Sequence, residues 1–255
     1  MAESCPRASI FRSEEHLMDS KSINRTFQIS IWYPPSYEES DQKYPVVYIL
    51  DSDAYFGAFA NLGLILWTGD LLPEYILVGI GYGINSYEEG MRLRMYDLMP
   101  PGENEKYETG GAESFLNFVE NELVPYMDAN YRAMKGDRSI IGHSAGGFFA
   151  LYAMFHRPKL FQRYCAGTPA PNYDNSVLFR YEEGFFKENS DLAAKLIITV
   201  GSLEGVLSKT EEFYRALKQR NYPNLDADLM VFQNDNHQSV VAQIINKAWP
   251  ALFGK

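Results

Sequence analysis

The sequence has little cysteine and no long hydrophobic run, and each shortage excludes a class of protein. Two cysteines, Cys5 and Cys165, stand far apart in a chain of 255 residues, so neither a disulfide framework nor a zinc knuckle is expected. The N-terminal region carries charges and lacks the apolar core of a signal peptide. The longest candidate membrane segment, Leu62 to Trp67, is far shorter than the ~20 apolar residues that cross a bilayer. We therefore expect a cytoplasmic protein that does not enter a membrane.

Positive charge is also in short supply. The chain has 23 basic and 33 acidic residues, which gives a net charge of −10. Nucleic acids and anionic membrane surfaces gain nothing from such a partner, so we expect neither. His-x-x-x-His and Cys-x-x-Cys do not occur, which argues against a protein-bound metal. The glycines of Gly79 to Gly83 lack the spacing of a dinucleotide-binding loop, so no cofactor is expected.

What the sequence does contain is a series of short, uninterrupted apolar runs separated by helical patterns. Such runs are typical of strands that helices cover on both faces. They occupy residues 44–50, 75–80, 139–141, 196–200 and 229–232. Segments with helical spacing of apolar residues lie at 54–67, 115–126, 148–156, 208–219 and 240–252. Alternation of strands and helices predicts an α/β fold with a mostly parallel central sheet and helices on both faces.

The ends of this pattern complete the predicted organisation. Residues 27–33 alternate between apolar and polar and stop at Pro34-Pro35, which predicts a half-buried antiparallel or edge strand. No repeat or linker interrupts the chain, so we predict a single domain over residues 1–255. Two long loops, about 84–111 and 167–194, are expected beside the functional site, since long loops in compact domains are usually functional. The aromatic residues of the second loop could form a lid, a pocket wall or buried packing.

The most informative motif is the hexapeptide Gly142-His143-Ser144-Ala145-Gly146-Gly147. It follows a predicted strand and precedes a helical segment, which is the context of a G-x-S-x-G nucleophile elbow. The turn that lifts a serine off the strand end is strained, and Gly142 and Gly146 would remove side chains that collide there. The backbone N–H of Ala145 would face the oxyanion of the reaction. We predict that Ser144 is a nucleophile.

Serine needs a general base, and only four histidines are available. His16 precedes the first predicted strand, His143 should point away from the hydroxyl, and His156 ends the helix after the elbow. His237 remains, in a polar loop directly after the last predicted strand. We therefore predict that His237 is the base.

The third member of such a triad is a carboxylate that orients the imidazole. In this fold it lies between the serine and the histidine in sequence. Glu204, which follows the strand at 196–200, is the preferred candidate. Asp174 and Asp235 stay open as alternatives, as does a Ser–His pair without an acid.

Two further regions could contribute to the site. The segment after residue 50 should supply a second oxyanion donor, and the backbone N–H of Asp53 is the best candidate. The Asp53 side chain should turn away or cap the following helix. Arg92, Arg94 and Asp97 could form a structural network of salt bridges or contact an acidic group of the substrate.

Taken together, these segments resemble the esterase D and enterochelin esterase-like family of serine hydrolases from about Arg25 to Trp249. The resemblance rests on the segments 44–56, 110–126 and 141–149, and on Asn130-Tyr131-Arg132. It implies an α/β-hydrolase fold, esters as substrates, Ser144, Glu204 and His237 at the catalytic positions, and Asp53 and Ala145 in the oxyanion hole.

This sequence departs from the family pattern in two loops. Met99 replaces the threonine that relatives often carry before a proline, and Thr168-Pro169-Ala170 followed by Tyr173 replaces Ser-Pro-Ser and a tryptophan. The expected function is hydrolysis of a small carboxylic ester, of siderophore, aryl or short acyl type, through an acyl-enzyme and without a cofactor. The alternatives are an acyltransferase with the same triad and a non-catalytic binding protein; the oligomeric state is left open.

Overall fold

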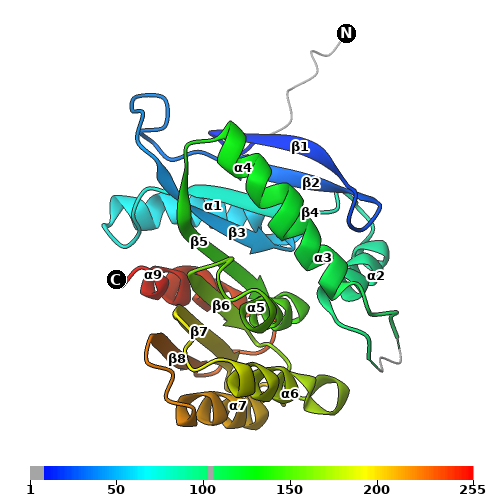
Figure 1. Cartoon of the computed structure of the whole chain (residues 1–255). Coiled ribbons are helices and arrows are strands. Elements are labelled where there is room, and N and C mark those ends of the chain that lie inside the picture. The colour runs from blue at the N-terminus through cyan, green and yellow to red at the C-terminus, as the bar shows by residue number, and fades with distance from the viewer. Residues whose placement is uncertain (1–8, 103–105, 255) are drawn as a thin grey trace.

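The computed structural model describes residues 9–102 and 106–254, so Cys5 lies outside the described residues. Within these ranges the chain forms an eight-stranded sheet with the order β1-β2-β4-β3-β5-β6-β7-β8 (Figure 1). The strands are β1 Ser13–Ser20, β2 Arg25–Trp32, β3 Tyr44–Leu50, β4 Ile76–Gly81, β5 Ala133–His143, β6 Arg163–Gly167, β7 Ala194–Gly201 and β8 Leu225–Phe232. Strands β3 to β8 pair in parallel, whereas β1 and β2 are antiparallel to their neighbours. The predicted α/β fold with a mostly parallel sheet is confirmed.

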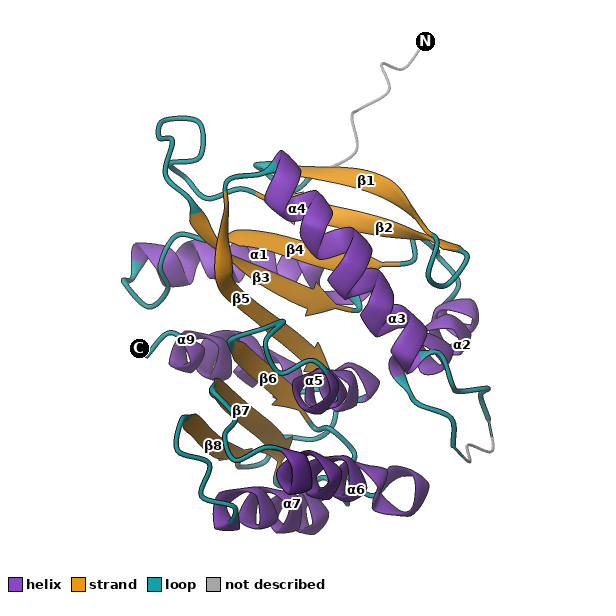
Figure 2. Ribbon diagram, viewed as in Figure 1, coloured by secondary structure: helices purple, strands orange, loops and turns teal. Residues whose placement is uncertain are grey.

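Helices cover both faces of this sheet (Figure 2). One face carries α3 Ala112–Phe118, the wide π-helical turn Val119–Leu123, α4 Val124–Asn130, α5 Ala145–His156, α6 Tyr173–Glu188 and α7 Leu207–Gln219. The other carries α1 Ser52–Thr68, α8 Val240–Gln243, a second π-helical turn Ile244–Ala248 and α9 Trp249–Leu252. Helix α2, Tyr87–Leu98, packs against α3 and α5.

Alternation along β3 shows why the central strands are apolar throughout. Tyr48 and Leu50 belong to the core under α5, whereas Val47 and Ile49 belong to the core under α1. Successive side chains of a strand point to opposite faces, so a strand covered on both faces has no position for a polar residue.

Both segments that the sequence predicted as long loops contain a helix, and this prediction was wrong. Of the twelve residues of α2 only Asp97 and Leu98 are buried, so no apolar stripe marks the helix; Ser86 begins it by accepting a hydrogen bond from the Glu89 N–H at 3.3 Å. Helix α6 opens with three residues of positive φ, 174–176, and becomes regular only after them. Its Phe179 ring packs 5.2 Å from that of Phe213 on α7, so this aromatic contributes to buried packing.

The sequence also did not predict β1, which lies at the edge of the sheet. Its Leu17 side chain is 77% exposed and its neighbours Glu14 and His16 are polar, so the strand carries no apolar alternation. Because β1 covers β2, the strand predicted at 27–33 is antiparallel but lies inside the sheet.

Candidate active site

The nucleophile candidate lies at the carboxyl end of a central strand. Strand β5 ends at His143 and α5 begins at Ala145, so Ser144 forms the turn between them. Its backbone has φ 59° and ψ −120°, a conformation that residues with a side chain rarely adopt. The Ser144 N–H donates to the Gly167 carbonyl at 2.8 Å, and the Ser144 carbonyl accepts from the Phe148 N–H at 2.9 Å. These bonds hold the strained turn between β6 and the first turn of α5.

Glycines around Ser144 allow a close approach of backbone segments. A Cβ atom on Gly142 would lie 2.2 Å from the Gly146 carbonyl oxygen, and one on Gly147 would lie 2.2 Å from the Gly167 carbonyl oxygen. At Gly146 the nearest atom, Asp51 Oδ2, would be 3.3 Å away, which is tight but no collision. The severe constraints are therefore at Gly142, as predicted, and at Gly147 instead of Gly146. Gly147 could not be predicted because the strand that it meets is distant along the chain.

The proposed base and acid are in direct contact. His237 Nδ1 lies 2.7 Å from Glu204 Oε2, so an Nδ1–H donates to the carboxylate and leaves Nε2 as an acceptor. The Glu204 side chain is 4% exposed and the His237 side chain 41% exposed. Glu204 Oε1 also accepts from the Gly201 N–H at 2.8 Å and from Thr168 Oγ1 at 2.9 Å. This buried carboxylate is thus fully hydrogen bonded, and Thr168 is a partner that the sequence did not reveal.

Backbone contacts bring the loops of Glu204 and His237 together. The Leu203 N–H donates to the Asp235 carbonyl at 3.1 Å, and the Ser202 N–H donates to the Phe232 carbonyl at 2.9 Å. A Cβ on Gly201 would lie only 2.3 Å from that Asp235 oxygen, so glycine is needed there. The loops after β7 and β8 are therefore fastened to each other by main-chain atoms.

The two alternative acids have other partners. Asp174 accepts from Arg180 at 3.0 Å, and Asp235 accepts from the Ser239 hydroxyl at 2.6 Å. Among the hydrogen bonds of the described residues, neither carboxylate bonds to the His237 ring. Glu204 is the acid that this structure places on the imidazole.

The contact between Ser144 and His237 is less direct. Within residues 9–102 and 106–254 no hydrogen bond joins the Ser144 hydroxyl to the His237 ring; such bonds are often long without substrate. The residue before Ser144 does reach the base, because the ring centroids of His143 and His237 are 4.6 Å apart. Burial, with a smaller effect from His237, lowers the pKa of His143 to about 4, so its ring is neutral at neutral pH.

A second helix N-terminus lies beside the elbow. Asp51, at φ 57°, precedes α1 and accepts two hydrogen bonds from Arg94, Nε to Oδ1 at 2.7 Å and Nη2 to Oδ2 at 2.8 Å. Arg94 Nη2 also donates to the His143 carbonyl at 3.3 Å. Burial lowers the pKa of Arg94, but the ion pair with Asp51 outweighs it and the net shift is upward. Arg94 therefore joins the start of α1 to the end of β5.

The Asp53 side chain bonds to the segment that follows β4. Its carboxylate accepts from the N–H groups of Tyr82 at 2.7 Å and Gly83 at 2.9 Å. In the described part of the chain the backbone N–H groups of Asp53 and Ala145 have no acceptor. Two unpaired amides at neighbouring helix N-termini could stabilise a developing negative charge.

The glycine segment 79–83 serves packing against this same helix end. A Cβ on Gly79 would lie 2.6 Å from Ser52 Cβ, and one on Gly81 would lie 2.5 Å from Ser52 Oγ. Close approach of β4 to α1 explains these glycines.

Arg94 and Asp97 belong to two separate ion pairs and not to one network. Asp97 pairs with Arg25 of β2 and is fully buried. Burial raises the pKa of Asp97 to about 6.

The remaining candidate groups lie elsewhere. His16 contacts Glu14 at 2.8 Å on β1, and His156 Nδ1 contacts the Tyr152 carbonyl at 2.8 Å. Burial raises the pKa of the Cys165 thiol to about 12. Among the described side chains, no group of three His, Cys, Asp or Glu is arranged to hold a metal ion. In the same part of the chain, every helix is too short or too polar to cross a bilayer.

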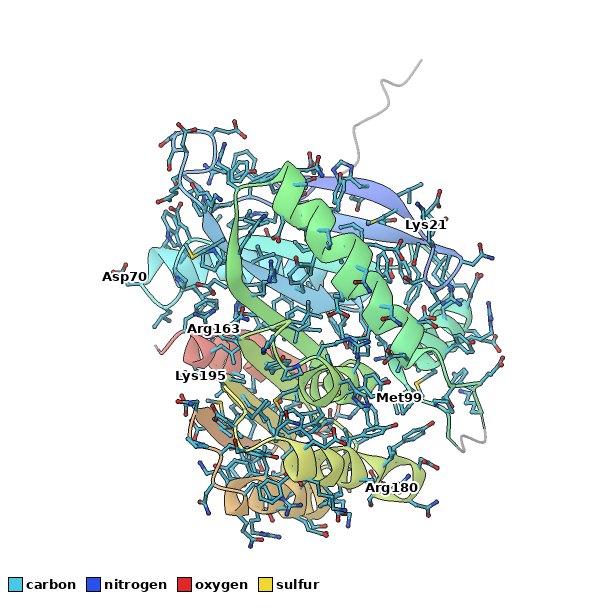
Figure 3. All side chains as sticks on the ribbon, in the orientation of Figure 1. Lys21, Asp70, Met99, Arg163, Arg180 and Lys195 are labelled. Atoms are coloured by element: carbon cyan, nitrogen blue, oxygen red, sulfur yellow. The ribbon has the colours of Figure 1, made fainter. Side chains whose placement is uncertain are left out.

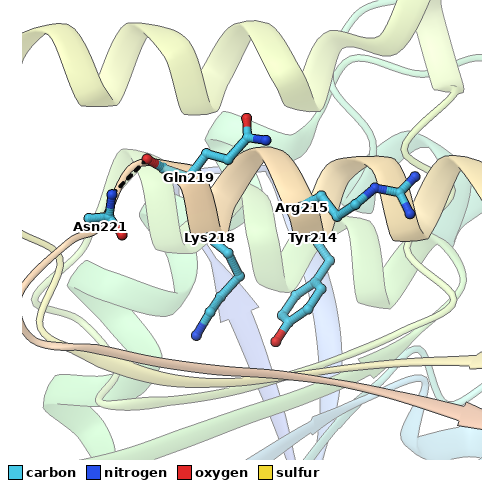
Figure 4. Close-up of a pocket in the computed structure, with 5 residues that line it drawn as sticks. All are labelled: Tyr214, Arg215, Lys218, Gln219 and Asn221. Carbon is cyan, nitrogen blue, oxygen red and sulfur yellow. Dashed lines mark hydrogen bonds between the residues drawn. The ribbon is translucent and has the colours of Figure 1, made fainter.

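One hollow adjoins the candidate site and another does not. The first, about 480 Å³, is bordered by Glu204 and His237. The second, about 540 Å³, lies along α7, where Tyr214 and Lys218 point toward β8 (Figure 4). Both side chains hydrogen bond to the Ala227 carbonyl, at 3.1 and 3.4 Å, so this hollow is part of the packing of α7 on the sheet edge.

Two characterised proteins are similar to this chain in sequence. The chain is 28% identical over 256 residues to the ferri-bacillibactin esterase of Bacillus subtilis, an alignment that covers 92% of this chain and 88% of the relative. A siderophore triacetylfusarinine C esterase from Aspergillus fumigatus is 30% identical over 168 residues, 63% of this chain and 56% of that one.

Two solved structures are similar over almost the whole chain. The crystal structure of the BES protein from Bacillus cereus has a TM-score of 0.84 at 29% identity, covering 96% of this chain and 97% of that one. An IroE-like serine hydrolase from Shewanella oneidensis has a TM-score of 0.81 at 25% identity, covering 95% and 80%. The family model described as "Putative esterase" matches residues 20–217. The predicted resemblance is thereby confirmed, and the chain belongs to this esterase family.

Proposed function

We propose that this protein is a serine carboxylic-ester hydrolase with Ser144 as nucleophile, His237 as general base and Glu204 as the acid that orients the base. The observation that carries the proposal is the 2.7 Å contact between Glu204 and His237 Nδ1, at the sheet edge where Ser144 occupies a strained turn. The contact fixes the tautomer in which Nε2 can accept a proton.

The reaction follows from the groups in place. His237 Nε2 takes the proton of the Ser144 hydroxyl while the oxygen attacks the ester carbonyl. The N–H groups of Ala145 and Asp53 stabilise the oxyanion, each donor contributing about 3 kcal/mol to the transition state. His237 then gives its proton to the leaving alcohol, and water releases the acyl group by the same steps. Glu204 stabilises the imidazolium that forms in between.

The relatives suggest a substrate. Two of them are named as siderophore esterases, so siderophores that contain ester bonds are the first compounds to test as substrates. Product analysis by mass spectrometry distinguishes hydrolysis from acyl transfer, because water yields a free acid and an added alcohol yields a new ester.

A fluorophosphonate probe tests the nucleophile directly. We expect the wild-type protein to be labelled at Ser144 and the Ser144→Ala variant to be unlabelled. Ser52→Ala is the matched control, since Ser52 also begins a helix at this sheet edge but is buried. Equal labelling of wild type and Ser144→Ala would refute the proposal.

A further inference from the structure

The hollow beside the base has a defined composition. We call it the His237 pocket; Thr168, Ala170 and the segments 203–206 and 236–238 line it, and its volume is about 480 Å³. These residues come from the loops after β6, β7 and β8, so the pocket opens at the same sheet edge as the elbow. A pocket of this size holds a small organic group.

Among the described residues that line the His237 pocket, none is a lysine or an arginine. Its carboxylate, Glu204, is 4% exposed and accepts hydrogen bonds from three groups, so it is not free to bind a ligand cation. A second carboxylate, Asp235, directly precedes the lining residue Asn236, and the chain as a whole carries −10.

Cations near the site are committed to other carboxylates. Arg94 is bound by both oxygens of Asp51, and its side chain is 14% exposed. Arg180, on α6 in Figure 3, is paired with Asp174 and also donates to the Asn175 carbonyl. The buried Arg94 guanidinium could bind an anionic substrate only by giving up Asp51, whereas Arg180 is 52% exposed and outside the pocket lining.

One apolar side chain stands out at the rim. Leu203 is 66% exposed, although it directly precedes the buried Glu204. Its N–H donates to the Asp235 carbonyl, which anchors its backbone. An exposed leucine in the same pocket lining as His237 offers an apolar contact to a bound ester.

We propose, building on the hydrolase function proposed above, that the His237 pocket selects uncharged esters, with Leu203 contacting the apolar part of the substrate and the surrounding negative charge disfavouring anionic acyl or alcohol groups. The preference for uncharged over anionic esters then has two sources, repulsion of the anionic ester by the negative charge and apolar contact of the uncharged ester with Leu203.

Two esters of matched shape test the charge preference. The 4-nitrophenyl esters of adipic acid and of adipic acid monoamide differ in one group, a carboxylate against a carboxamide. At low ionic strength and neutral pH we expect kcat/KM for the amide to exceed that for the carboxylate by about tenfold, and added salt to narrow the gap. Equal kcat/KM values for the two esters would overturn the proposal.

A charge inserted at Leu203 tests the residue assignment. Leu203→Lys should raise kcat/KM for the carboxylate ester relative to the amide by about tenfold. Leu17→Lys is the matched control, because Leu17 is also an exposed leucine but lies on β1, and it should leave the ratio unchanged. An unchanged ratio in Leu203→Lys would overturn the role of Leu203.

Ser144→Ala separates this inference from the function on which it rests. If the substitution abolishes hydrolysis of both esters while the wild-type ratio is near one, the charge preference is wrong and the hydrolase function stands. If Ser144→Ala hydrolyses both esters at the wild-type rate, the proposed function itself is wrong.

Discussion

Adjacent strands β3 and β5 each deliver a helix N-terminus to the same sheet edge, but the two ends are held differently. Both turns pass through positive φ, 57° at Asp51 and 59° at Ser144. The start of α1 is fixed by side chains, with Asp51 on Arg94 and Asp53 on two backbone amides. The start of α5 is fixed by close backbone packing at its glycines.

The difference shows how one sheet edge can hold two helix starts by different contacts and leave the proposed nucleophile free of structural bonds. At α1 the side chains of Asp51 and Asp53 make structural hydrogen bonds, and Ser52 is buried. At α5 the turn is held by backbone packing and by one bond from Arg94 to the His143 carbonyl, so the Ser144 hydroxyl is not used to hold it. The substitutions below test this contrast, from the largest expected effect to the smallest.

The largest contrast is between the two serines. Ser144→Ala removes the proposed nucleophile, and we expect kcat for a 4-nitrophenyl ester to fall by at least about 10⁴-fold. Ser52→Ala, at the other helix start, should change kcat by less than about threefold, since no mechanistic step uses it. Similar rates for both variants would contradict the assignment of α5 as the reactive end.

Removing the ion pair between Arg94 and Asp51 should destabilise the start of α1. Arg94→Gln leaves the Asp51 carboxylate largely buried without its cation, and we expect the free energy of unfolding to fall by about 3–4 kcal/mol. Urea denaturation measures this change. Arg180→Gln breaks a pair whose arginine is 52% exposed and should cost less than about 1 kcal/mol. Equal losses in the two variants would show that the Asp51–Arg94 pair has no special role.

A methyl group at the elbow tests the glycine packing. Gly147→Ala places a Cβ 2.2 Å from the Gly167 oxygen and should lower the free energy of unfolding by about 2–3 kcal/mol. Gly146→Ala, in the same helical turn but 3.3 Å from its nearest neighbour, should cost about 1 kcal/mol or less. The same urea experiment compares them, and the reverse order would contradict the packing described at α5.

The last comparison concerns the residue that precedes each turn. Leu50, before Asp51, cannot bind a proton, whereas His143, before Ser144, can. The pKa of His143 is about 4 in the folded chain, below the unfolded value of about 6.5, so the unfolded state binds more protons between these values. The free energy of unfolding therefore decreases as the pH falls through this window. Burial is the main cause; His237 adds to it, while Glu204 and Asp51 oppose it.

Substitution by an uncharged residue should remove this acid sensitivity. Between neutral pH and about pH 5 we expect wild type to lose about 2 kcal/mol more than His143→Gln. Urea denaturation at the two pH values gives the difference. Identical losses would mean that the His143 ring accepts a proton as readily in the folded state as in the unfolded one.

The sequence predicted most strands that are buried on both faces, although it missed the short strand β6. Strands β3, β4 and β7 are apolar throughout because both faces are covered, and that pattern is visible in the residues alone. It could not predict β1, which has one exposed edge, or α2, which buries two residues of twelve. An element with little apolar surface leaves no periodic signal.

For the site, residues at strand ends could be chosen from the sequence, and their contacts could not. Ser144, Glu204 and His237 follow predicted strands, and their catalytic roles stay predictions. The pairing of Arg94 with Asp51 joins positions 43 residues apart, and Gly147 meets the backbone of another strand. No local pattern encodes which distant segment a side chain will touch.

The main-chain bonds between the loops after β7 and β8 have one more consequence. The backbones of Leu203 and Ser202 are hydrogen bonded to those of Asp235 and Phe232, so the loops of Glu204 and His237 form one unit. Ser144 follows β5, which β6 separates from that unit. A displacement of β5 relative to β7 would move Ser144 away from His237 and leave the contact between Glu204 and His237 intact. If Ser144 and His237 act as proposed, the distance between them is set by the packing of β6 between β5 and β7.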